Sequence, residues 1–185
     1  MFLNRQQALN ELNTRLSDSD LFRNSIAVEA VMREFAAEYN EDIDKWGMLG
    51  LLHNIDYELT GNDLERRGII AAVILESLDV DDSIVYSIKS QNDLSGIARK
   101  RKMDKLLYAA SPLCILITAS ALELSSKKLS DVSIEFVLDK FNEKGFAEEA
   151  DRGHIKSCEE IDVSLEYFIE VALGAMKKVA VELEL

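Results

Sequence analysis

The sequence predicts an all-α protein, and two observations carry that prediction. Its 185 residues include one proline and eight glycines, so few positions interrupt a helix. Apolar residues recur mostly at intervals of three and four, which is the period of an amphipathic helix rather than of a strand. This length suits one domain with a core of its own. We expect a single domain over 1–185, with its core in 20–124 and C-terminal helices in 131–185 packed on that core.

Helices are expected at 3–16, 20–39, 42–55, 63–78, 81–91, 103–124, 131–143, 147–159 and 165–183. Most contain an apolar line at helical spacing, as in Val28, Val31 and Phe35; Trp46 and Leu49; Ile70, Ala71, Ile74 and Leu78; Ile84 and Ile88; Leu107, Cys114 and Ile115; and Leu165, Phe168, Ile169, Ala172, Met176 and Val179. Ser164 suits the N-cap of the last helix, and Glu166 suits its positive dipole end. The clearest turn is "LTGND" at 59–63.

Charge and cysteine content narrow the classes of function. The 21 basic and 34 acidic residues give a net charge of −13, which opposes binding to nucleic-acid backbones. Cys114 and Cys158 form no CxxC pair, so we expect no thiolate metal site and a reducing compartment. The N-terminus has no apolar h-region, and the uncharged run Leu106–Leu122 is short and polar for a membrane span. The expectation is a cytoplasmic protein with neither nucleic-acid nor membrane partners.

Five helices carry a polar residue where the apolar period calls for a buried side chain. These residues are Asn24, His53, Arg67, Gln91 and Ser111. Each alone has a structural explanation, such as a core histidine with one partner, a helix cap, or an arginine whose head reaches solvent along its stem. Buried polar groups need partners, and the most economical arrangement is that all five meet in one polar pocket.

The segments around these positions resemble a known family. "NSIAVEAVMREFA", "GLLHNIDYELTG", "ERRGIIAAVILESL", "YSIKSQND" and "DKLLYAASPL" are similar to segments of the His-Asp superfamily of metal-dependent phosphohydrolases, the HD domain, and in particular to a compact bacterial and archaeal subgroup. The resemblance runs from about residue 20 to the C-terminus. It implies an HD-domain-like helical bundle.

The resemblance also implies a degenerate metal site. In the family the ligands follow the order His, His-Asp, Asp, and they would fall on Asn24, His53, Asn54 and Ser111. Two further histidines of such subgroups would fall on Arg67 and Gln91. Divalent cations and iron need imidazole or anionic oxygen donors, and of these positions only His53 supplies one. We therefore expect no resident metal cofactor and no catalytic residue.

The leading hypothesis is a pseudoenzyme. A catalytically silent HD-like domain would bind a small anion, such as a nucleotide or phosphate ester, or act as an interaction module with an empty pocket. The expected pocket residues are Asn24, His53, Asn54, Asp56, Arg67, Gln91 and Ser111. A buried guanidinium needs a partner, so Arg67 is expected to contact Asp56, directly or through water, in place of the missing cation. The sequence does not indicate an oligomeric state.

An active phosphohydrolase is the alternative hypothesis. It would combine His53 and Asp56 with a carboxylate such as Glu58 or Asp104, and it would hold manganese or iron weakly. Serine hydrolysis by Ser111 with His53 and Asp56 is disfavoured, because no glycine pattern of a nucleophile elbow surrounds the serine.

Two features lie outside these patterns. The basic run "RKRK" at 99–102 is either a solvated loop before a helix or a lip that attracts phosphate. His154, in "DRGHIKSCEE", is interpreted as a surface or helix-start histidine.

Overall fold

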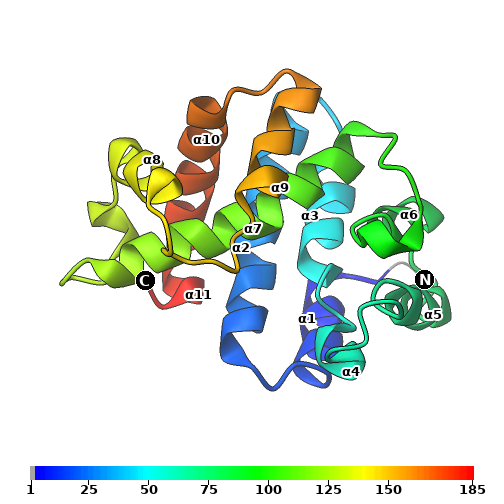
Figure 1. The fold of residues 1–185 in the computed structure, drawn as a ribbon. Coiled ribbons are helices and arrows are strands. Elements are labelled where there is room, and N and C mark those ends of the chain that lie inside the picture. Colours follow the sequence, from blue (N-terminus) through cyan, green and yellow to red (C-terminus); the bar gives the residue numbers. More distant parts are fainter. Residues whose placement is uncertain (1–2) are drawn as a thin grey trace.

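The computed structural model describes residues 3–185 and shows an all-α bundle with no strand in that range (Figure 1). This confirms the fold class expected from the sequence. In chain order the elements are α1 (Arg5–Asn13), α2 (Ser19–Glu38), α3 (Ile43–Leu52), α4 (Tyr57–Thr60), α5 (Ile69–Ser77), α6 (Asp82–Lys89), the 3-10 turn η1 (Asp93–Ser95), α7 (Lys102–Glu123), η2 (Leu129–Asp131), α8 (Ile134–Asn142), α9 (Arg152–Lys156), η3 (Ser157–Ile161), α10 (Leu165–Lys178) and α11 (Ala180–Leu183).

Several helix bounds differ from expectation: the helices expected at 3–16 and 42–55 end early, at Asn13 and Leu52, and three other differences have a local reason. The helix expected at 63–78 begins only at Ile69, because Gly68 adopts φ 82° and separates α5 from the turns before it. The helix expected at 147–159 begins at Arg152, where the Asp151 carboxylate accepts a hydrogen bond from the backbone N–H of His154. The last helix is interrupted at Val179, with φ −112° and ψ 17°.

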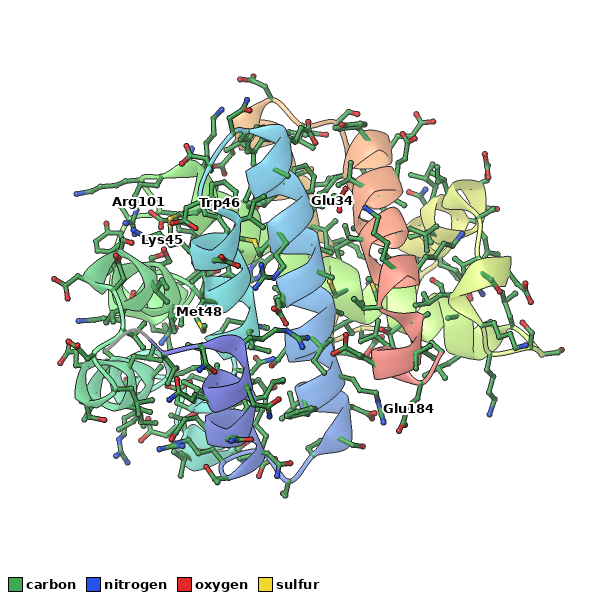
Figure 2. The ribbon with its side chains drawn as sticks, turned by 180° about the vertical axis from the view of Figure 1, so that it is seen from behind. Glu34, Lys45, Trp46, Met48, Arg101 and Glu184 are labelled. Atoms are coloured by element: carbon green, nitrogen blue, oxygen red, sulfur yellow. The ribbon has the colours of Figure 1, made fainter. Side chains whose placement is uncertain are left out.

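The central helix is α2, which packs against α3, α7 and α10. Viewed from behind, it runs between α3 and α10 (Figure 2). The close contact with α3 depends on Gly50, where a Cβ atom would lie 2.8 Å from the Val28 carbonyl oxygen and 2.9 Å from the Glu29 Cα. Only glycine therefore permits this crossing, which brings the C-terminal end of α3 beside α2.

The longest helix is α7, which crosses the molecule (Figure 1). It is the one helix among residues 3–185 that is long and apolar enough to cross a membrane, and 61% of that apolar window is buried inside the fold. On one side of α7, α5 and α6 pack on each other; on the other side lies α8 (Figure 1). Helices α8, α9 and α10 all contact α7.

Candidate functional site

Four of the expected site residues meet at the junction of α2, α3 and α7. The Asn54 side-chain amide donates to Asn24 Oδ1 at 3.1 Å and to Ser25 Oγ at 3.3 Å. The Asn24 amide donates to the backbone carbonyl of Ser111 at 3.4 Å. His53 Nε2 lies 3.0 Å from Ser111 Oγ. The close approach of Asn24, His53, Asn54 and Ser111 expected from the sequence is thus confirmed, and we call these four residues the neutral cluster.

The hydrogen bonds of His53 define its tautomer. Its Nδ1 lies 2.6 Å from the Gly50 carbonyl oxygen, which can only accept, so Nδ1 carries the proton. The Nε2 lone pair then accepts from the Ser111 hydroxyl. Burial lowers the pKa of His53 to about 4, although the Gly50 hydrogen bond acts in the opposite direction. His53 is therefore uncharged at neutral pH, and so is the whole cluster.

Asp56 makes no direct hydrogen bond or ion pair with Arg67, so the direct form of the expected contact is absent, although the Arg67 charge still acts against the rise in the Asp56 pKa that burial causes. One Asp56 carboxylate oxygen accepts from the backbone N–H groups of Gly68 at 2.7 Å and Ala71 at 3.0 Å. These N–H groups are available because α5 starts at Ile69 rather than at 63, so the carboxylate occupies the positive end of α5. Burial raises the pKa of Asp56, and the two backbone hydrogen bonds oppose that shift.

Arg67 is held at the pocket wall by other groups. Its guanidinium carbon lies 4.0 Å above the centre of the Tyr57 ring, and Nη2 donates to the Gly61 carbonyl at 2.9 Å. Nε makes a long contact of 3.5 Å to Thr60 Oγ1. Within residues 3–185, Nη1 has no hydrogen-bond acceptor. The guanidinium thus keeps one nitrogen for a ligand.

Gln91 lines the same pocket without joining the neutral cluster. Its amide nitrogen donates to the backbone carbonyls of Ser87 at 2.8 Å and Asp104 at 3.2 Å. It therefore ties α6 to the first turn of α7.

A pocket of about 530 Å³ opens over these residues. It is lined by six of the seven expected site residues, namely His53, Asn54, Asp56, Arg67, Gln91 and Ser111. Asn24 instead lines a neighbouring cavity of about 270 Å³, which shares Ile115 and Glu149 with the larger pocket. The side chains of Tyr57, Leu64 and Leu94 in the pocket lining are each at least 39% exposed, so part of the exposed lining is apolar.

His154 lies in the first turn of α9 with its side chain partly exposed, as the sequence interpretation expected, but that interpretation did not place it in the pocket. His154 lines this pocket, so both histidines of the chain face the same space. Its ring lies 4.1 Å from the Tyr108 ring, and the Tyr108 hydroxyl donates to Asp93 Oδ2 at 2.7 Å. No periodicity could place His154 here, because α9 has five residues and its position is set by packing on α7.

The basic run at 99–102 forms the loop that leads into α7, as expected, and Lys100 and Lys102 are exposed. Its two arginines are paired within the fold, and none of its four residues lines the pocket described above. Arg99 stacks 3.6 Å above the Tyr108 ring and donates to Asp93 at 2.9 Å. Arg101 contacts the fully buried Asp104 carboxylate at 2.9 Å.

The carboxylates proposed for an active hydrolase are occupied elsewhere. Asp104 also accepts from the Ser87 hydroxyl at 2.7 Å, and Glu58 accepts from the backbone N–H groups of Ser17 and Asp18, both at 2.7 Å. In the described part of the chain, no three His, Cys, Asp or Glu side chains are placed together to hold a metal ion.

Arg152 organises the loop that carries the acidic edge of the pocket. Its guanidinium donates to five backbone carbonyls and to no carboxylate; the acceptors are Lys140, Phe141, Phe146, Ala147 and Ala150, at 2.5–3.1 Å. Burial lowers the pKa of Arg152. The loop held in this way places Glu149 and Asp151 in the pocket lining.

Comparison of this chain with protein-family models, with curated proteins and with solved structures gives no match. The similarity to the His-Asp superfamily is therefore a resemblance of the sequence segments quoted above alone.

Proposed function

We propose that this chain is an HD-like domain whose metal site is replaced by an uncharged pocket, and that it binds a small phosphorylated ligand without hydrolysing it. The observation that carries the proposal is the neutral cluster. Its side chains form two hydrogen-bonded pairs, Asn24 with Asn54 and His53 with Ser111, which Asn24 links through the Ser111 backbone carbonyl. These are the positions where the resemblance places the metal ligands.

The chemistry of the cluster favours a silent site. A divalent cation would need several anionic oxygens or imidazoles, whereas the cluster offers one imidazole, two amides and a hydroxyl. The imidazole lone pair is already engaged by the Ser111 hydroxyl. Without a bound cation, the absence of carboxylates in the cluster avoids burying unpaired negative charge.

Arg67 is the proposed anchor for the ligand's phosphate. Its free Nη1 and its fixed plane over Tyr57 suit hydrogen bonding to a phosphate oxygen. The other charged residues in the pocket lining include the carboxylates Asp56, Asp93, Glu149 and Asp151. These carboxylates would repel a ligand with several phosphates, so the proposed ligand is a phosphate monoester such as a nucleoside monophosphate. The proposed location of the protein is the cytoplasm.

One observation favours the alternative of a metal-dependent phosphohydrolase. His53 donates from Nδ1 to a backbone carbonyl, as metal-binding histidines do, and the residue lines the pocket. Manganese or iron held there would have few other ligands. An interaction module with an empty pocket is the remaining candidate.

Calorimetric titration with adenosine monophosphate, adenosine and inorganic phosphate tests the proposal. We expect the monophosphate to bind, Arg67→Met to weaken it about 10-fold or more, and Arg67→Lys to restore it in part. Arg66→Met is the matched control, since Arg66 is exposed beside Arg67 but does not line the pocket.

Metal analysis and a phosphoesterase assay with added manganese separate the alternatives. We expect no stoichiometric manganese, iron or zinc and no turnover. Stoichiometric metal lost in His53→Gln, together with turnover, would establish the hydrolase. Absence of binding by all three probes would favour the interaction module.

A further inference from the structure

The side-chain amide of Asn54 has only one orientation that suits its neighbours. The Ser111 backbone carbonyl can only accept, so the Asn24 amide nitrogen faces it and Asn24 Oδ1 is left as an acceptor. Asn54 therefore directs its nitrogen, not its oxygen, at Asn24 Oδ1. The Ser25 hydroxyl requires the same orientation, because it donates to the Leu21 carbonyl at 3.1 Å and its oxygen accepts from Asn54.

The oxygen of this amide has no partner inside the fold. No donor among residues 3–185 reaches Asn54 Oδ1, although Asn54 is only 7% exposed. In that range the one fully buried polar side-chain atom that lacks a hydrogen bond is the Tyr39 hydroxyl, so Asn54 Oδ1 is open to solvent. The space that Asn54 lines is the pocket of about 530 Å³. Asn54 thus presents a fixed hydrogen-bond acceptor to the pocket.

Gln91 and Ser111 present acceptors to the same pocket. Gln91 directs its amide nitrogen at the backbone carbonyls of Ser87 and Asp104, which can only accept. Its Oε1 is therefore the free atom of the amide, and it has no donor within residues 3–185. The Ser111 hydroxyl donates its hydrogen to His53 Nε2, which leaves only lone pairs on Ser111 Oγ.

The free polar groups of the pocket therefore divide into two kinds. Asn54, Gln91 and Ser111 offer uncharged acceptors, and Arg67 Nη1 offers a charged donor. A phosphate, which accepts, suits Arg67 but opposes the amide oxygens. An apolar group placed against these oxygens would leave them unsatisfied, which costs binding free energy. The part of a ligand that lies on the amide oxygens therefore has to supply hydrogens.

We propose that the ligand is the phosphate monoester of a sugar, whose hydroxyl groups donate to Asn54 Oδ1 and Gln91 Oε1 while its phosphate lies on Arg67. This inference rests on the proposed function and narrows it to hydroxylated ligands such as a ribonucleotide. Loss of a hydroxyl leaves an amide oxygen unpaired, which is how a polar site rejects an analogue that lacks one donor.

Calorimetric titration of the wild-type chain with adenosine monophosphate and its 2′,3′-dideoxy analogue tests the inference. We expect the analogue to bind about 10-fold more weakly or worse, because both hydroxyl donors are lost. Affinities equal to within about twofold would overturn the inference and leave the proposed function intact. Absence of binding by adenosine monophosphate would instead remove the proposed function, and this inference with it.

The control ligand is purine riboside monophosphate, which keeps both hydroxyls and lacks the 6-amino group of the base. It should bind within about threefold of adenosine monophosphate, since its sugar is unchanged. A loss of affinity confined to this analogue would show that the donor is an amine, and would overturn the assignment to sugar hydroxyls.

Variants of the chain assign the discrimination to the amide oxygens. The ratio of the two affinities, about 10 in the wild type, should fall to about threefold or less in Asn54→Ala and in Gln91→Ala. Arg67→Met is the matched control: it should weaken both nucleotides about equally and keep the ratio, because both carry the phosphate. A ratio unchanged in both alanine variants would overturn the assignment. The wild-type ligand series decides the inference even where a variant fails to fold.

Discussion

Helix α2 carries two polar groups of opposite kinds five residues apart, the buried Glu29 and the partly buried Asn24. Glu29, 3% exposed, is a full negative charge: its carboxylate accepts from Arg5 Nε at 2.8 Å and from Arg33 Nε at 2.9 Å. Both arginines continue to surface acids, Arg5 to Glu182 and Arg33 to Asp44. Asn24, by contrast, belongs to a cluster without any charge.

The two groups differ in how the cost of burying a charge is met. The Glu29 carboxylate can be buried because the chain itself supplies two cations, from α1 and from the same helix. No arginine or lysine contacts the neutral cluster among the described residues, so charge there would depend on an added ion. Neutral side chains remove that dependence. The cluster around Glu29 is therefore expected to stabilise the fold, whereas the neutral cluster leaves a pocket open to a ligand.

The largest effect is expected from a substitution in the charged cluster, which consists of Glu29, Arg5 and Arg33. Glu29→Gln keeps the shape but leaves Arg5 and Arg33 without their shared buried carboxylate, and we expect a loss of about 3 kcal/mol in the free energy of unfolding. Urea unfolding at neutral pH measures it. The control is Glu34→Gln, whose carboxylate faces α10 (Figure 2) and pairs with Lys178 at the surface. It should cost less than about 0.5 kcal/mol. Equal losses in both variants would remove the distinction between buried and exposed pairs.

Adding charge to the neutral cluster is the second test. Asn54→Asp buries a carboxylate that has no cation, and we expect a loss of about 2–3 kcal/mol at neutral pH. The introduced carboxyl should have a raised folded pKa, so the penalty is absent below about pH 4 and grows as pH rises through that pKa. In the triple variant with Asn24→His and Ser111→Asp, manganese should bind and reverse the loss. If the triple variant binds no metal, the HD-like placement of these residues is wrong.

The titration of His53 gives the third test. The pKa of His53 is about 4 in the folded chain and about 6.5 in the unfolded chain. Between about pH 4 and pH 6.5 the unfolded chain therefore binds more protons than the folded chain. The stability from neutral His53 is complete above about pH 6.5, and about 2 kcal/mol of it should be lost as pH falls to about 4.5. The measurement is the difference in unfolding free energy between the wild type and His53→Gln across this range. A constant difference would show that His53 titrates normally.

The smallest expected effect comes from the hydroxyl of the neutral cluster. Ser111→Ala removes the donor to His53 Nε2 but spares the Asn24 hydrogen bond, which uses the Ser111 backbone carbonyl. We expect a loss of about 1 kcal/mol, against almost none for the exposed Ser130→Ala. A loss as large as that of Glu29→Gln would mean that the neutral cluster is as important for stability as the charged one.

The parts of the site that the sequence predicted lie on or directly beside long helices. Asn24 and Ser111 belong to α2 and α7, and His53 follows α3 directly, so the helical period indicated which way each side chain faces. Arg67 and Asp56 lie in the segment before α5, where Gly68 breaks the period, and the direct contact expected between them is absent. His154 was missed because α9 is too short to show a period.

Arg152 allows the amino-acid sequence of the loop between α8 and α9 to vary. Its guanidinium donates to three backbone carbonyls of that loop and to two at the end of α8, and every amino acid provides such a carbonyl. Most exposed side chains of the loop can therefore vary without loss of its shape, provided that the arginine remains. Lysine cannot replace it, because one ammonium has three donors and no planar fork to reach five acceptors. One residue thus keeps this wall of the pocket in place while leaving its chemistry open to evolutionary change.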